Sequence, residues 1–164
     1  MAAHALGKAR EVAARTSLDA RAILSADTTV LAGEQVLGKP SDRDDARRML
    51  VDLAGQTHTV ATAVCLIIKG SEHTFVDETH VRFQPYGAAQ IAWYLERGEW
   101  QGRAGAYAIQ GSGATLVAGI EGDFTTVVGL PMARLLDLMQ ACGLAPWSDA
   151  EGGVAGEGAV RLFG

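Results

Sequence analysis

Asp27 and Thr28 are the first residues in this chain of 164 whose types and position could do chemistry. They follow the apolar run RAILSA (21–26), which is typical of a buried strand. A carboxylate at the end of such a strand stands where α/β sheets place ligand sites. It could act as a base toward water or hold a metal ion. The alternative is a turn carboxylate that hydrogen-bonds to nearby backbone.

The second candidate is Lys39, in the tripeptide Gly38-Lys39-Pro40. The glycine lets a ligand approach and the proline stiffens the chain. An ammonium group held just before a helix N-terminus suits a phosphate, because the helix end adds backbone donors. The GxxxxGK[ST] spacing of a P-loop is absent. The alternative is an ordinary surface lysine.

The third candidate is RAGAYAIQGSG (103–113), in which small residues surround Tyr107 and Gln110. The Gln110 amide carries both a donor and an acceptor, so it could read the edge of a base. The alternative is a close-packed turn around a buried tyrosine. Lys8 lies on an alanine-rich segment and is by default solvated, and His58 and Thr62 lie in a predicted strand, where structural roles are commoner.

The elements that must position these residues follow from apolar spacing and from Gly, Pro and Ser signals. Helices are predicted over 3–15, from an N-cap at Ser41 to Gly55, over 87–97, and from Pro131 to Gly143. Strands are predicted over 21–31, 57–68, 75–83 and 114–120, with a hairpin turn at 69–72. Because helices interleave with strands and one strand pair is a hairpin, we expect an α/β fold with a mixed sheet and flanking helices.

Composition narrows the class of protein. The net charge is −5, which argues against a basic nucleic-acid footprint. No apolar run approaches the roughly 20 residues that span a bilayer, and the N-terminus has no secretory signal. Cys65 and Cys142 belong to no CxxC pair, so packing is their expected role. We expect a cytoplasmic protein with no nucleic-acid polymer or membrane partner, consisting of one domain (1–145) and a flexible Gly/Ala-rich tail (146–164).

Taken together, the segments resemble the Maf family of nucleoside triphosphate pyrophosphatases. The resemblance is carried, in order, by SADTTV, LGKPSDRDDARRMLVDLAGQTHTVAT, YLERGEWQGRAGAYAIQG and IEGDFTTVVGLPM, from about residue 8 to residue 143. It implies an elongated mixed sheet and a cleft between two lobes, as in the inosine triphosphatase group. It also implies cleavage between the α and β phosphates, with Mg²⁺ or Mn²⁺ as cofactor, and a homodimer.

The resemblance also implies roles for individual residues. Asp27 matches the family's proton acceptor, which can also touch the metal, and Lys39 and Lys8 match two phosphate-binding lysines. Thr28 and Gln110 match the branch that acts on dTTP and UTP. An amide can donate and accept toward a uracil or thymine face, whereas a carboxylate favours the donors of guanine.

One feature departs from the family pattern. Residues 1–7 match neither its first strand nor its Ser/Arg-rich phosphate-binding loop, so we expect an N-terminally shortened form of the fold. The alternative function is therefore a truncated, catalytically silent protein that binds nucleotides or forms dimers. A purine-directed pyrophosphatase of similar fold is a second alternative.

Overall fold

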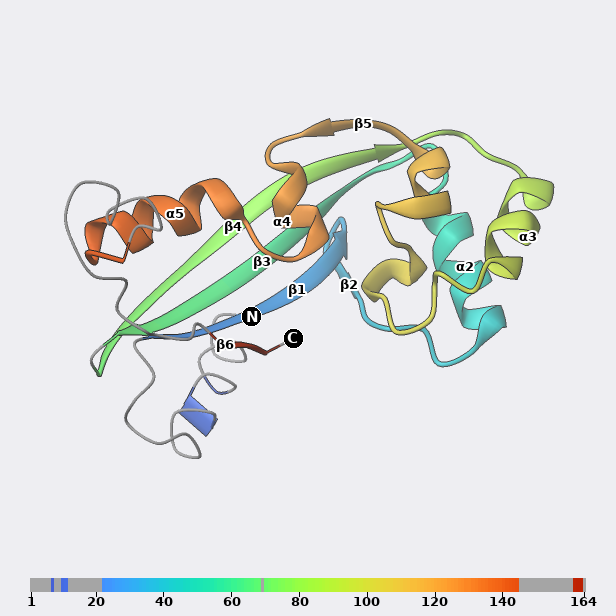
Figure 1. Ribbon diagram of the computed structural model, residues 1–164. Helices are drawn as coiled ribbons and strands as arrows, with labels where there is room; N and C mark the ends of the chain where they lie inside the picture. Colours follow the sequence, from blue (N-terminus) through green and yellow to red (C-terminus); the bar gives the residue numbers. More distant parts are fainter. Residues whose placement is uncertain (1–6, 8–9, 12–21, 69, 145–160, 164) are drawn as a thin grey trace.

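The computed structural model, shown in Figure 1, describes residues 7, 10–11, 22–68, 70–144 and 161–163. Its sheet has the strand order β2-β1-β3-β4-β5, and every neighbouring pair in that path is antiparallel. A further strand, β6, pairs parallel with β1, so the sheet is mixed. The strands are β1 (Ala22–Ala32), β2 (Gln35–Leu37), β3 (Thr57–Ile68), β4 (Ser71–Phe83), β5 (Val117–Glu121) and β6 (Arg161–Phe163).

Some helices pack along the sheet, and others form a group beyond one end of it. α4 and α5 lie along the long β3–β4 hairpin, whereas α2 and α3 cluster beyond β2 (Figure 1). The α-helices are α2 (Arg43–Leu53), α3 (Ala88–Glu96), α4 (Phe124–Val128) and α5 (Met132–Ala141), and the 3-10 helices are η1 (Ala104–Ala106) and η2 (Gly111–Leu116). The expected α/β fold is confirmed.

Two large hydrophobic clusters pack on one face of the sheet, and a small third cluster around Ala63 and Cys65 lies on the other face. The larger joins β1, β3 and β4 to α2 and α3, with Leu50, Leu53, Phe83 and Tyr94 almost fully buried. The smaller packs the other end of the sheet against α5 through Leu135. Between these two large clusters, the same face of the sheet carries the buried Thr62, and α4 packs over it.

The sequence-based elements differ from the structure at several places. β2 was not predicted, and β4 begins at Ser71, inside the predicted turn 69–72. β1 agrees with the predicted strand 21–31, but Asp27 lies inside this strand and not at its end, because all ten residues 22–31 pair with β3. The N-cap of α2 is Asp42 rather than Ser41, since the Asp42 carboxylate accepts the Asp45 N–H at 2.8 Å. β5 begins at Val117 because the preceding residues form η2, and α4 was not predicted at all.

Some expectations fall on residues outside the described ranges. Most of the predicted helix 3–15 is among them, as are residues 146–160 and 164 of the predicted tail. Residues 161–163 of that segment form β6. In the part of the chain that the structure describes, no helix is both long enough and apolar enough to cross a membrane.

Candidate functional site

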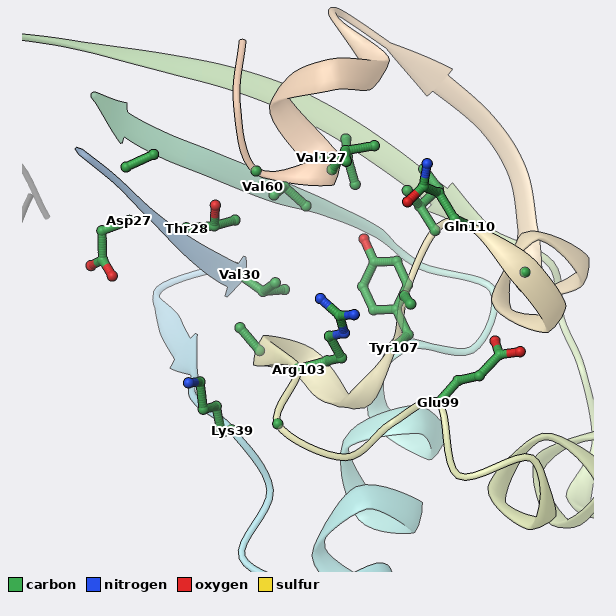
Figure 2. Close-up of a pocket in the computed structure, with 18 residues that line it drawn as sticks. Asp27, Thr28, Val30, Lys39, Val60, Glu99, Arg103, Tyr107, Gln110 and Val127 are labelled. Carbon is green, nitrogen blue, oxygen red and sulfur yellow. The ribbon is translucent and has the colours of Figure 1, made fainter. Parts of the chain in front are cut away.

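A cleft of about 610 Å³ opens beside β1 and brings together four of the five residues singled out from the sequence. Figure 2 shows Asp27, Thr28 and Lys39 around one part of it and Gln110 at the far side. The fifth residue, Lys8, lies outside the described residues. The opposite wall comes from the connector, residues 97–116, which links α3 to β5 and contains η1 and η2.

Asp27 and Thr28 reach the cleft from different faces of the sheet. Successive side chains of a strand point to opposite faces, and these two residues are consecutive in β1. In Figure 2, Asp27 lies on the same side of β1 as Lys39, whereas Thr28 lies on the side of Val127 and Tyr107. The cleft therefore wraps around β1, and it offers a carboxylate on one side and a hydroxyl on the other.

Lys39 is held near the cleft by the strand before it and by the connector. It follows β2, and the carbonyl of its neighbour Gly38 accepts the Gly105 N–H at 3.1 Å. The expected help from a helix N-terminus is not found, because Asp42 caps α2 and no residue of α2 lines the cleft. Lys39 is exposed, and its ammonium group is a point charge on a flexible side chain.

The connector keeps its shape through backbone conformations that favour glycine. Gly105 has a φ of 68°, and a Cβ there would lie 3.0 Å from Cγ1 of Val30. Its neighbour Ala106 has a φ of 60°, which is costly for a residue with a side chain, and it is completely buried. Strain of this kind persists only where the surrounding packing overcomes it, and it is common beside ligand sites.

Glu99 fixes the loop that carries Gln110. Its two carboxylate oxygens accept the backbone N–H groups of Ser112 at 3.0 Å and Gly113 at 3.1 Å. These hydrogen bonds, led by the one from Ser112, hold the pKa of Glu99 below its ordinary value. A Cβ at Gly111 would lie 2.9 Å from a Glu99 oxygen, so the glycine allows this close approach. Charge-assisted bonds to backbone of this kind position a loop strongly.

The buried Tyr107 ring is part of the apolar lining of the cleft, and its hydroxyl group is held by His58. The Tyr107 hydroxyl lies 2.9 Å from Nε2 of His58, and both rings pack edge-on against Phe83. Burial lowers the pKa of His58 to about 4 and raises that of Tyr107. His58 is therefore neutral near pH 7, and its role is to orient the tyrosine.

The charged groups of the cleft are mixed in sign. Lys39 and Arg103 are exposed cations at its edge, and Asp27 and Glu99 are half-buried carboxylates. Within the described ranges, no group of three or more His, Cys, Asp or Glu side chains is placed to hold a metal ion alone. The arrangement can neutralise an anionic ligand with two cations and present a carboxylate to a water molecule beside it.

Sequence reasoning did not single out Glu99 or Arg103 as members of the site. Arg103 was the first residue of the third segment, and its cationic side chain in a glycine-rich stretch was an available signal. Glu99 carried no signal of that kind. Its role depends on a hydrogen-bonded loop twelve to fourteen residues away, which no local pattern reveals.

Comparisons with known proteins find similar sequences that cover most of this chain. The family model described as "Maf-like protein" matches residues 1–142. The chain is 45% identical over 159 residues to a dTTP/UTP pyrophosphatase of Anaeromyxobacter sp. (strain Fw109-5), covering 93% of this chain and 76% of that protein. It is 46% identical over 126 residues to a dTTP/UTP pyrophosphatase of Myxococcus xanthus, covering 76% of this chain and 64% of the relative. A Symbiobacterium thermophilum protein with the same name is 45% identical over 139 residues, or 85% of this chain and 71% of its own length.

Proposed function

The chain belongs to the family of Maf-like proteins, and on that premise we propose that it is a pyrophosphatase of dTTP and UTP. The reaction is hydrolysis between the α and β phosphates, which gives a nucleoside monophosphate and pyrophosphate. The observation that carries the proposal is the meeting of Asp27, Thr28, Lys39 and Gln110 around one cleft. These residues come from three separate segments of the sequence, and curated relatives that carry the name dTTP/UTP pyrophosphatase match across all three segments.

We assign the phosphate end of the substrate to the side of β1 that carries Asp27 and Lys39. A triphosphate bears three to four negative charges, and its hydrolysis is catalysed largely by positioning and charge neutralisation. Lys39 and Arg103 supply positive charge at the rim of the cleft. Asp27 acts as the proton acceptor for the attacking water, and pyrophosphate leaves as the α–β bond breaks.

We assign the base to the side of the cleft lined by Tyr107 and Gln110. The Tyr107 ring offers an apolar surface for a planar base, and His58 fixes its orientation. The Gln110 amide N–H can donate to a carbonyl oxygen of uracil or thymine. The Glu99 hydrogen bonds to Ser112 and Gly113 hold the loop that carries this amide.

A divalent cation fits the donor set in one particular way. Mg²⁺ commonly keeps several waters and binds through one or two carboxylates together with substrate phosphates. Asp27 supplies a half-buried carboxylate on the side of β1 that we assign to the phosphates. The cation, Mg²⁺ or Mn²⁺, would supply charge neutralisation at the phosphate oxygens once the nucleotide is bound. Asp27 is the side chain of this cleft that would hold the cation.

The test is release of pyrophosphate from dTTP, UTP, CTP, GTP and inosine triphosphate by the folded chain, with Mg²⁺, with Mn²⁺ and with a chelator. We expect turnover of dTTP and UTP that exceeds turnover of GTP and is lost with the chelator. A preference for inosine triphosphate would instead favour a purine-directed pyrophosphatase. Calorimetric binding of dTTP without turnover would favour a catalytically silent nucleotide-binding protein.

The cellular location of the protein and its oligomeric state stay predictions. A cytoplasmic location follows from the proposed substrates, which are used there in nucleic-acid synthesis. The homodimer implied by the family resemblance is tested by light scattering coupled to size-exclusion chromatography, which reports the mass of the particle in solution.

A further inference from the structure

A row of polar side chains crosses one face of the sheet between the two hydrophobic clusters. Thr28 of β1 pairs with Thr62 of β3, and Thr62 pairs with Asp77 of β4. Thr126 of α4 lies over the row, and both Thr62 and Thr126 are completely buried. Buried hydroxyl groups need hydrogen-bond partners, so the direction of each hydrogen bond in the row can be assigned from chemistry.

The direction follows from the carbonyl group at one end. Oγ1 of Thr62 lies 2.7 Å from the carbonyl oxygen of Thr126, which can only accept, so Thr62 donates its single hydroxyl proton there. Oγ1 of Thr28 lies 2.9 Å from Oγ1 of Thr62. Because the Thr62 proton is already used, Thr28 must be the donor in this pair. Thr28 is left with lone pairs alone, and it can only accept a hydrogen bond from a ligand in the cleft.

The far end of the row keeps the Thr126 carbonyl in place. Oγ1 of Thr126 donates to Oδ2 of Asp77 at 2.6 Å, and Nη1 of Arg134 lies 3.5 Å from Oδ1 of that carboxylate. The same carbonyl accepts the Gly129 N–H at 3.1 Å, so both of its acceptor positions are occupied. A Cβ at position 129 would lie 3.4 Å from Oγ1 of Thr28, so the glycine also leaves room beside that hydroxyl.

We propose that Thr62 is a positioning residue which makes Thr28 an acceptor only, and that Thr28 thereby selects uracil and thymine over cytosine. This inference rests on the proposed function. N3 of uracil and thymine carries a proton, so the N3–H group can donate a hydrogen bond to the Thr28 hydroxyl oxygen. N3 of cytosine is itself an acceptor, so two acceptors would meet without a proton between them, and an unpaired polar contact of this kind is costly.

The place of Thr28 in the cleft favours the base over the phosphates as the group it contacts. Thr28 lies on the side of β1 that also presents Val127 and Tyr107, away from Asp27 and Lys39 (Figure 2). Phosphate oxygens at neutral pH offer few protons to an acceptor. A ribose hydroxyl is the other possible donor, and uridine and cytidine nucleotides share it, so it would give no selection between them.

The experiment compares Thr62→Val, which removes the hydroxyl at similar volume, with the matched control Thr62→Ser, which keeps it. The ratio of kcat/KM for UTP to kcat/KM for CTP is measured for both and for the unchanged chain. We expect the unchanged chain to favour UTP by at least about tenfold. Thr62→Val should lower that ratio about tenfold, mainly through KM for UTP, while Thr62→Ser stays within about threefold of the original. An equal loss for both nucleotides in Thr62→Val, or an unchanged ratio, would overturn the proposal.

A second arm measures binding by calorimetry, using α,β-methylene analogues of UTP, CTP and N3-methyl-UTP that cannot be hydrolysed. We expect the N3-methyl and CTP analogues to bind the unchanged chain at least about tenfold more weakly than the UTP analogue. Equal binding of the UTP and N3-methyl analogues would show that N3–H is not the group recognised, and it would overturn the proposal. If the chain hydrolyses no nucleotide, the proposed function fails while this arm still decides the inference. The calorimetric comparison on the unchanged chain can also be made if Thr62→Val does not fold.

Discussion

Asp27 and Thr28 are neighbours in β1, and they line the same cleft from opposite faces of the sheet. Two different functional groups of the cleft therefore come from adjacent positions of one strand. The carboxylate lies on the side of Lys39, and the hydroxyl lies on the side of Tyr107 and Gln110. A one-residue slip in the pairing of β1 with β3 would exchange the two side chains, so the roles proposed for both residues depend on the β1–β3 register.

Asp27→Asn should remove hydrolysis and keep nucleotide binding. The amide has nearly the same shape as the carboxylate but cannot accept a proton from water, so we expect kcat to fall by about 10²–10⁴-fold. Calorimetry should show dTTP binding within about tenfold of the unchanged chain, because the cations at the cleft remain. Glu34→Gln, in the turn between β1 and β2 and outside the cleft, serves as the control. A variant Asp27→Asn that keeps its original kcat would remove Asp27 from the role of base.

Glu99→Gln should weaken substrate binding more than it slows the chemical step. A glutamine side chain has one acceptor oxygen and no charge, so it cannot keep both hydrogen bonds to Ser112 and Gly113. We expect KM for dTTP to rise about tenfold with kcat changed less than about threefold, because the loop that carries Gln110 becomes less well positioned.

The matched control for this change is Glu96→Gln, three residues earlier. Glu96 is exposed and pairs with Arg43 at 2.9 Å, away from the cleft. It should leave both constants unchanged. Equal effects of the two substitutions on KM would mean that the charge of this region, and not the hydrogen bonds of Glu99, affects the substrate.

Gly105→Ala should destabilise the fold more than Gly33→Ala does. Both glycines have a positive φ, 68° and 60°, so each alanine pays a similar backbone cost of about 1 kcal/mol. Only at position 105 would the new Cβ also lie 3.0–3.3 Å from three atoms of Val30, whereas nothing lies within 4 Å at position 33. We expect the free energy of unfolding, measured by urea denaturation, to fall by about 2–4 kcal/mol in Gly105→Ala and by about 1 kcal/mol in Gly33→Ala. Equal losses would show that Val30 moves aside freely.

His58 should make stability depend on pH below 6.5. Its pKa is lowered by burial from 6.5 to about 4 in the folded state, so between these values the unfolded chain binds more protons than the folded chain. The free energy of unfolding should therefore fall as pH falls from 6.5 to 4, by up to about 3 kcal/mol from this group. Urea denaturation across that range measures it, with His58→Gln as comparison. A slope that is the same in both proteins would show that the ring is solvated when folded.

Much of the fold could be predicted from residue patterns, because β3, α3 and the stop signal at Gly55 depend on local spacing. The position of Asp27 was wrong, since it was expected at the end of a buried strand whereas the pairing of β1 with β3 continues past it to Leu31. α4 is only five residues long, and its N-terminus is defined by Asp123 accepting the Thr125 N–H at 2.7 Å. Short helices of this kind depend on tertiary contacts more than on apolar periodicity.

The candidate site was predictable where the family pattern names residues and not where distant contacts create a role. Asp27, Lys39 and Gln110 were identified and do line one cleft. The support given by Glu99 to Gly113 and by Thr62 to Thr28 joins residues 14 and 34 positions apart. Such pairs form only when the sheet and the connector are folded, so no local sequence signal could reveal them.

The most direct test of the proposed activity is identification of the products formed from dTTP and Mg²⁺, by anion-exchange chromatography of a reaction taken to partial completion. The proposal predicts dTMP and pyrophosphate in equal amounts, with no dTDP at any time, and no product from Asp27→Asn at the same protein concentration. Formation of dTDP with inorganic phosphate, or an unchanged dTTP peak with correctly folded protein, would contradict it.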